Sequence, residues 1–149
     1  MTVTFRHTFT VLLSVLLIAG CQVSEDEVEA TRDALDELEA ELEQLPEFVE
    51  VSARFDPGTL TPSIATITVE AQAAEDTDVD TELVETATLT TWRSGIPTVS
   101  RLAVEIRDAE REILSDTREL FGSRMVSRRD LEERFGPRDQ PRDQPRDQD

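Results

Sequence analysis

Several residue types are scarce or absent in this chain, which has no Lys, no Tyr and a single His, Cys and Trp among 149 residues. One cysteine cannot pair within the chain, so a disulfide scaffold is excluded. Only one long apolar run exists, near the N-terminus, which excludes a protein that crosses a membrane several times. The length instead fits one domain of about 100 residues with short appendages.

The apolar run covers residues 9–19 and follows a short polar start that contains Arg6 and His7. As a helix rising about 1.5 Å per residue, it would reach about 16 Å, roughly half the hydrocarbon thickness of a bilayer. That length is typical of the apolar region of a secretory signal and too short for a stable span. We therefore interpret residues 1–20 as a signal peptide.

The run ends in Ile18-Ala19-Gly20-Cys21, which resembles a bacterial lipobox. The resemblance implies cleavage between Gly20 and Cys21 and a diacylglyceryl group on the cysteine sulfur, with residues 21–25 as the lipidated N-terminus and a short tether. Two acyl chains suffice for stable anchoring, because each buried methylene contributes about 0.8 kcal/mol. The expected location is the extracytoplasmic face of the cell membrane. The alternative is an ordinary signal peptide with a chance cysteine.

Cleavage there would leave 129 residues and change the formal charge from −18 to −19, because it removes Arg6 and no acid. Residues 122–149 hold seven Arg and seven acids, so residues 21–121 carry the whole negative charge. Such an acidic body repels nucleic acid and anionic lipid. We expect no nucleic-acid partner, and an envelope protein as the candidate partner besides the membrane.

The same composition argues against catalysis. The cleaved chain contains no His, Lys or Tyr, and no free thiol once Cys21 is acylated. This excludes most nucleophile–base pairs, Schiff-base chemistry and most zinc or iron sites. We predict no enzyme, no catalytic residue and no cofactor, and the catalytic alternative is a reaction that uses carboxylates alone.

The first expected element of the cleaved chain is a helix over residues 25–44, with Ser24 and Glu27 in a capping-box pattern and Pro46 as its stop. Two interpretations of its apolar stripe are a helix laid on the domain's own sheet and a coiled coil for self-association. Fewer than three clean heptads favour the first. The stripe consists of Val28, Leu35, Leu38, Leu42 and Leu45.

Two alternating segments around a turn signal predict an antiparallel hairpin. Residues 47–55 and 65–71 alternate apolar and polar side chains, as half-buried strands do, and Pro57 and Gly58 favour a turn between them. The apolar set is Val49, Val51, Ala53, Phe55, Ala65, Ile67, Val69 and Ala71. The polar set is Glu50, Ser52, Arg54, Thr66, Thr68 and Glu70.

A second helix is expected over residues 80–93 and a third strand over residues 101–107. Leu83, Val84, Ala87 and Thr91 recur at helical spacing, and Leu102, Val104 and Ile106 alternate with Arg101, Glu105 and Arg107. The order helix–strand–strand–helix–strand predicts an α+β two-layer sandwich, with a small, mainly antiparallel sheet and helices on one face. The acidic α+β domain is assigned to residues 26–121.

Weaker signals follow. Ile113, Leu114, Leu120 and Phe121 are expected to cover an open edge or the end of the sheet. Residues 122–136 form a C-terminal region with a short helix from Ser127, its expected cap, and with Leu131 inward. Residues 137–149, three copies of Pro-Arg-Asp-Gln and one Asp, have no apolar residue and are expected to be disordered.

Two features are candidate ligand sites. Asp76, Asp78 and Asp80 match the first acidic positions of a calcium loop, but Thr81 and Ala87 replace its Gly and Glu, so no metal site is predicted. Trp92, before the helix end at Gly95, is most simply a core residue. A ligand-binding role for Trp92 is the alternative.

The chain resembles the small uncharacterised actinobacterial membrane lipoproteins, through the lipobox and through Leu131-Glu132-Glu133-Arg134-Phe135-Gly136-Pro137-Arg138. Residues 26–107 also resemble the element order of BON domains, envelope modules associated with phospholipid contact. The leading hypothesis is a lipid-anchored, non-enzymatic adaptor or binding module. The alternative is a small-ligand or lipid-binding module of BON-like architecture.

Overall fold

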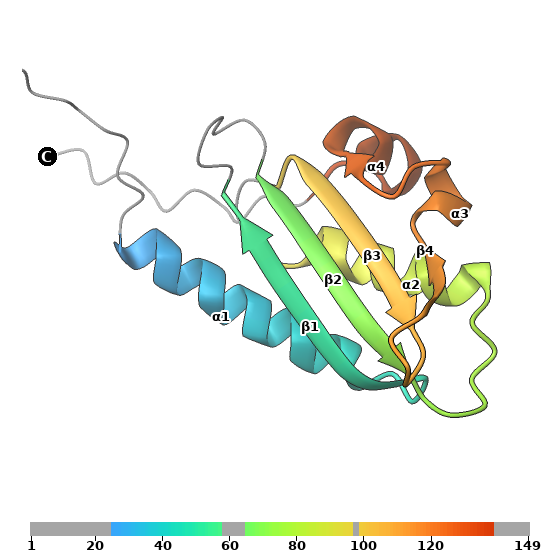
Figure 1. The fold of residues 1–149 in the computed structure, drawn as a ribbon. Helices are drawn as coiled ribbons and strands as arrows, with labels where there is room; N and C mark the ends of the chain where they lie inside the picture. The colour runs from blue at the N-terminus through green and yellow to red at the C-terminus, as the bar shows by residue number, and fades with distance from the viewer. Residues whose placement is uncertain (1–24, 58–64, 97–98, 139–149) are drawn as a thin grey trace, which may run out of the picture.

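The computed structural model describes residues 25–57, 65–96 and 99–138, and these form an α+β fold, as predicted (Figure 1). Cys21, the signal-peptide residues, Ser24 and the tail beyond Arg138 lie outside the described residues. The elements, in chain order, are α1 (Glu25–Leu42), β1 (Phe48–Asp56), β2 (Thr66–Ala73), α2 (Thr81–Arg93), β3 (Arg101–Arg107), β4 (Ile113–Asp116), α3 (Arg118–Phe121), β5 (Val126–Ser127) and α4 (Arg128–Phe135).

The sheet has the strand order β1-β2-β3-β4, and the short β5 also pairs with β3. β1 and β2 form the predicted antiparallel hairpin, with Val51 opposite Ala71. β2 and β3 are parallel, with Val69 opposite Val104, because α2 carries the chain back across the sheet between them. β4 and β5 are antiparallel to β3, so three of the four pairings are antiparallel.

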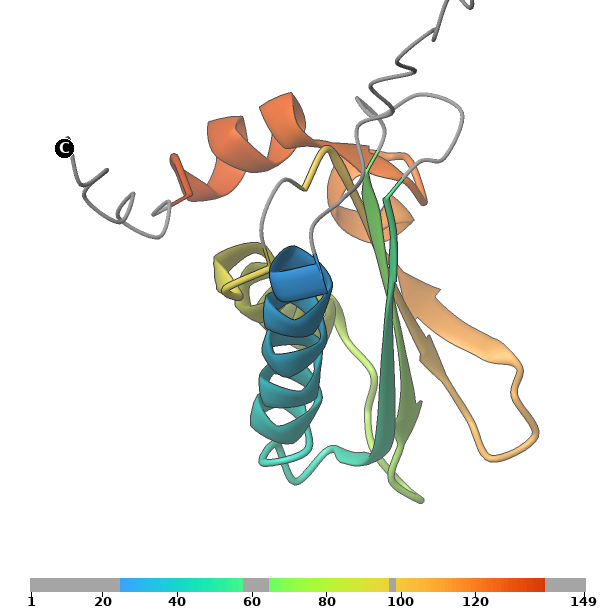
Figure 2. The same cartoon turned by 90° about the vertical axis from the view of Figure 1, so that its left-hand side faces the viewer.

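Helices α1 and α2 lie side by side on one face of the sheet (Figure 2). The alternating apolar residues of the strands point toward these helices and form one core with them. Leu38 and Leu42 of α1 are 1% and 0% exposed, so the apolar stripe of this helix packs on the domain's own sheet. The largest buried side chains of this core are Trp92, Leu38, Leu42, Ile67, Ile96, Leu102, Ile106 and Leu131.

The structure corrects two sequence expectations. Val49, expected to point inward, is 59% exposed, because the register of β1 and β2 shifts between Phe48 and Glu50 and leaves it as the extra residue of a bulge. Ile113 and Leu114, expected to cover an open edge or the end of the sheet, belong to strand β4, which pairs along the edge of β3, but their own side chains are 38% and 48% exposed rather than covering apolar surface.

The C-terminal region completes the same core rather than standing apart from it. β5 pairs Val126 with Leu102, and Leu131 of α4 is fully buried. The Ser127 hydroxyl accepts a hydrogen bond from the Asp130 amide at 3.3 Å, as the predicted N-cap does. Among the described residues, no helix has both the length and the apolar character needed to span a membrane.

Candidate functional site

The face of the sheet opposite α1 and α2 is covered by no described helix (Figure 2). Strand pairing sets its side chains in rows: Ser52 opposite Glu70, and Glu70 opposite Glu105. We call this surface the open face; it consists of Glu50, Ser52, Arg54, Thr66, Thr68, Glu70, Gln72, Glu105 and Arg107. It is a polar, rigid surface on the central strands.

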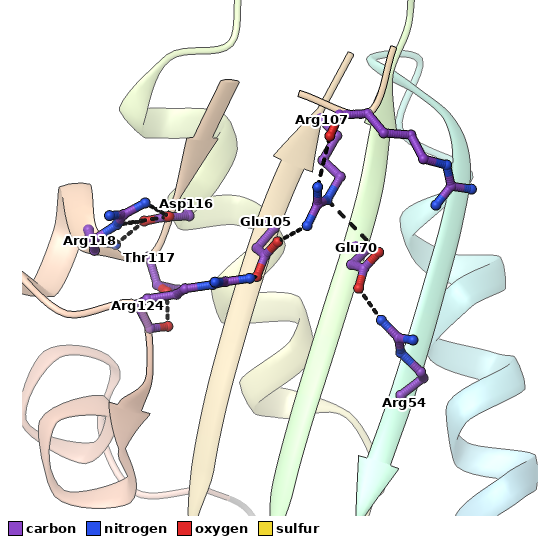
Figure 3. Close-up of polar contacts among 9 residues, drawn as sticks. Arg54, Glu70, Glu105, Arg107, Asp116, Thr117, Arg118 and Arg124 are labelled. Carbon is purple, nitrogen blue, oxygen red and sulfur yellow. Dashed lines mark hydrogen bonds and ion pairs between the residues drawn. The ribbon is translucent and has the colours of Figure 1, made fainter. Parts of the chain in front are cut away.

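Glu105 is the most buried charged residue of the open face, with 1% of its surface exposed. Arg107, two residues along β3, donates a hydrogen bond to its carboxylate from one side. Arg124, from the loop before β5, reaches it from the other side, with Nε 2.5 Å from Oε1 (Figure 3). A buried carboxylate is tolerated when it is paired in this way.

The pairing continues across the sheet to the edge strand. Glu70 of β2 lies beside Glu105, and two like charges on neighbouring strands repel. Arg107 stands between them, with its Nε 3.9 Å from Glu70 Oε2, and Arg54 of β1 pairs with the other side of Glu70 (Figure 3). These five residues, Arg54, Glu70, Arg107, Glu105 and Arg124, are called the ion-pair row.

The ion-pair row has one more guanidinium than carboxylate, whereas the whole chain has a formal charge of −18. Its outer members are the accessible ones, since the side chains of Arg54 and Arg124 are 67% and 52% exposed. The ion-pair row therefore has exposed guanidiniums at both ends and the carboxylates of Glu70 and Glu105 between them.

Asp116 is a second buried carboxylate, opposite Glu105 in the β3–β4 pairing and 3% exposed. Arg118 holds it from two sides: its Nε lies 3.0 and 2.9 Å from the two carboxylate oxygens, and its backbone amide donates at 2.8 Å (Figure 3). The Arg118 side chain thereby lowers the pKa of Asp116 below its ordinary value of 3.8, against the opposing effect of burial. Asp116 is anionic at neutral pH.

The hollow beside Arg107 on the open face is small. It has a volume of about 40 Å³ and is lined by Glu50, Glu70, Arg107 and Arg111, among others. One molecule of liquid water takes up about 30 Å³, so water fits there and an organic cofactor does not. Arg107 also donates a hydrogen bond at 2.8 Å to the Arg111 carbonyl, which fixes its side chain.

A larger hollow of about 570 Å³ lies where β1 begins and the β3–β4 turn passes. Val49 and Leu114, both exposed, flank it, and Glu75, Asp76 and Glu110 supply carboxylates. The predicted acidic loop therefore borders this hollow at Asp76. Asp80 has a different role, because its Oδ1 accepts from the Leu83 amide at 2.9 Å and caps α2. Among the described residues, no three His, Cys, Asp or Glu side chains are placed so that they could hold a metal ion.

Trp92 is 1% exposed and belongs to the core on the helix-covered side of the sheet. Its Nε1 donates to the Gly136 carbonyl at 3.2 Å, and the Arg138 guanidinium lies over its ring, 5.6 Å from the centroid. A ligand that contacts Trp92 must first displace Arg138. Trp92 and the ion-pair row therefore lie on opposite sides of the sheet.

The sequence reasoning missed the ion-pair row. It placed Glu105 on the side of the strand opposite Leu102, Val104 and Ile106, which is right, but it did not predict that Glu105 is buried. A signal was present: Glu105 stands between Val104 and Ile106, two residues from Arg107. Its second partner, Arg124, lies 19 residues away and comes close only through folding.

Comparison of the chain with protein-family models and with curated protein sequences gives no match.

Proposed function

We propose that this chain is a lipid-anchored, non-enzymatic adaptor on the extracytoplasmic face of a bacterial membrane. Cys21 would carry the acyl chains, and the open face would hold a protein partner. The lipobox resemblance supports the anchor. The open face supports the adaptor role, because its β1 and β2 part carries exposed side chains, no described helix lies on it, and Arg54 and Arg124 are exposed at its two ends.

The paired carboxylates of the sheet support binding rather than catalysis. Glu70, Glu105 and Asp116 are each paired with at least one guanidinium. Arg118 lowers the pKa of Asp116, which disfavours proton exchange by this carboxyl group near neutral pH. Arginine is also enriched at protein interfaces. The partner that fits is a protein surface with exposed acidic side chains, which Arg54 and Arg124 would pair with.

The distance between anchor and domain also fits an adaptor held near the membrane. α1 begins at Glu25, four residues after Cys21, and four extended residues span at most about 14 Å. The acidic body disfavours contact with anionic headgroups. We therefore infer that the anchor, and not an attraction between domain and lipid, provides membrane attachment.

The anchor is tested by metabolic labelling with a clickable fatty-acid analogue. Wild type and the control Gln22→Ala, which keeps the cysteine, are expected to incorporate label into the membrane fraction. Cys21→Ala is expected to incorporate none. Equal labelling of Cys21→Ala and wild type would contradict the anchor.

The adaptor role is tested with a photo-cross-linking amino acid in intact cells. Placed at Thr68, between Arg54 and the β3 strand on the open face, it is expected to give a discrete heavier product. The matched position is Glu37, exposed on α1 on the other side of the domain. Arg54→Glu, at a 67% exposed side chain, is expected to weaken the Thr68 product without unfolding the domain. Equal products from both positions, or none from Thr68, would contradict the proposed face.

A further inference from the structure

The C-terminal tail repeats one tetrapeptide three times, as residues 137–140, 141–144 and 145–148. Only the first copy reaches into the described residues, through Pro137 and Arg138. The guanidinium of Arg138 is held by contacts with the folded domain, and each of the three copies of the repeat contains one such arginine. Arg142 and Arg146 occupy the same place in the later copies.

Arg138 binds at the C-terminal end of α2. Its guanidinium lies over the Trp92 ring, 5.6 Å from the centroid, and its Nη2 donates to the Ser94 carbonyl and lies 3.4 Å from Ser94 Oγ. A guanidinium over an indole face is the most favourable cation–π pair. The carbonyls at a helix C-terminus carry partial negative charge, which also favours a cation.

The rest of this site is built independently of Arg138. Ser94 is the C-cap of α2, and its amide and hydroxyl both donate to the Thr91 carbonyl, at 3.3 and 2.8 Å. Trp92 is held in the core by its hydrogen bond to Gly136. The Trp92 ring and the Ser94 carbonyl are therefore held in position by contacts that do not involve Arg138. Burial there, and next the charge of Arg128, lowers the pKa of Arg138 to about 10, so it is still charged at neutral pH.

We propose that Trp92 and Ser94 form a binding site for the arginine of the repeat, occupied by Arg138 and open to Arg142 and Arg146 of the same chain as alternative occupants. The hydrogen bonds and the cation–π contact at the site are made by the guanidinium, and every copy of the repeat supplies one. The tail would then be held by any one of three equivalent units, and the length beyond the site would change in steps of four residues. This inference is independent of the proposed anchor and partner.

Chain geometry permits the exchange. Gly136 stays fixed by Trp92, and the arginine now in the site follows it by two positions in the sequence. With Arg142 bound, this separation would be six positions, and with Arg146 bound, ten. Loop-closure entropy makes these longer connections about fivefold and about elevenfold less probable than the first. Arg138 is therefore the main occupant, and Arg142 takes over when Arg138 is removed.

The single tryptophan of the full chain reports on the site directly. Trp92 emission and its quenching by acrylamide are measured in wild type, Arg138→Gln, Arg138→Gln/Arg142→Gln and the triple variant that also has Arg146→Gln. Arg142→Gln/Arg146→Gln is the matched control, because it keeps Arg138. Circular dichroism verifies that each variant has the wild-type helix content.

The Trp92 emission and quenching of the control are expected to equal those of wild type, and those of Arg138→Gln are expected to stay close to wild type. Quenching should then rise stepwise, with the triple variant showing the largest quenching constant and a red-shifted emission. Three results would overturn it: Arg138→Gln already equal to the triple variant, the triple variant equal to wild type, or a changed control. Protection of Arg138→Gln that disappears on dilution would also overturn it, because the occupant would then come from a second copy.

Discussion

Glu105 shows how one residue determines the character of a whole surface. Its carboxylate is 1% exposed in the middle of β3, and it receives hydrogen bonds from Arg107 and Arg124. An unpaired buried charge would strongly destabilise the fold. The buried carboxylate of Glu105 therefore needs the two arginines as partners. Their positions on the open face follow from that requirement.

Glu105→Gln is expected to lower the free energy of unfolding by about 1–3 kcal/mol, because it removes the charge that two guanidiniums face. Glu70→Gln is the matched change on the same face. Glu70 is 22% exposed, so solvent screens its pairs and the expected loss is below about 1 kcal/mol. Urea unfolding of both variants measures the difference. An equal loss, or a larger loss for Glu70→Gln, would show that burial at Glu105 is not the determining factor.

Asp116 predicts a specific acid sensitivity. Its pKa is lowered in the folded state by the hydrogen bonds from Arg118, whereas the unfolded chain has the ordinary value near 3.8. The unfolded state therefore binds the proton first as the pH falls. This group stabilises the fold above about pH 4, and its contribution is lost as the pH falls through the lowered value.

Asp116→Asn is expected to be less stable than wild type at neutral pH and to lose less stability between about pH 5 and pH 2. The urea midpoint measured across that range tests both statements. Parallel pH curves for the two proteins would mean that Asp116 has the same pKa in the folded and unfolded states.

At the scale of elements, α2 is the helix that connects the two halves of the sheet. It crosses between the parallel strands β2 and β3, and six of its residues are buried. Its start is defined by Asp80, whose carboxylate accepts from the Leu83 amide at 2.9 Å. This hydrogen bond satisfies an amide that has no partner within the helix.

Asp80→Ala is expected to lower the free energy of unfolding by about 1 kcal/mol through loss of the N-cap. Asp78→Ala is the control, at an exposed loop position in the same acidic stretch, with an expected change within about 0.5 kcal/mol. Thermal or urea unfolding of the pair distinguishes a capping role from a general effect of removing negative charge. Similar losses in both variants would contradict the capping role.

The longer elements could be predicted from hydrophobic periodicity. Helical spacing in α1 and α2 and alternation in β2 predict which side chains face the core. The structure buries the side chains so predicted, among them Leu38, Leu42, Val69, Val84 and Ala87. β4 and β5 could not be predicted in this way, since four and two residues are too short to show a period. They are defined by pairing with β3, which is a tertiary interaction.

The candidate site was less predictable than the fold. Alternation placed Glu70, Glu105 and Arg107 on one face, but it gives no information on which of them is buried. That depends on Arg124, whose side chain reaches the strand through the turn after α3. The position of Trp92 as a core residue at the end of α2 was the simpler of two interpretations. The Arg138 guanidinium, which lies over the Trp92 ring, belongs to the first copy of the repeat and was not predicted to contact it.

At the scale of the whole molecule, the dominant property is an unbalanced charge of −18 on a small domain. Self-repulsion of this size opposes the compact state, whereas the ion-pair row favours it. Salt screens both effects, and the Debye length falls from about 10 Å at 0.1 M to about 3 Å at 1 M. The repulsion involves many exposed acids, and the buried pairs are screened less.

The melting temperature is therefore expected to rise by a few degrees when sodium chloride is raised from about 0.02 M to about 0.5 M. Differential scanning calorimetry of the purified chain measures it. A fall in melting temperature with salt would mean that exposed ion pairs contribute more to stability than self-repulsion takes away.

The covalent state of Cys21 is the central claim, because it decides whether the acidic domain and its open face are held at a membrane. Mass spectrometry of the N-terminal peptide from the membrane fraction tests it most directly. The account predicts a peptide that begins at Cys21 and carries the added mass of a diacylglyceryl group. A chain with residues 1–20 attached, or an N-terminus with an unmodified cysteine thiol, would contradict it.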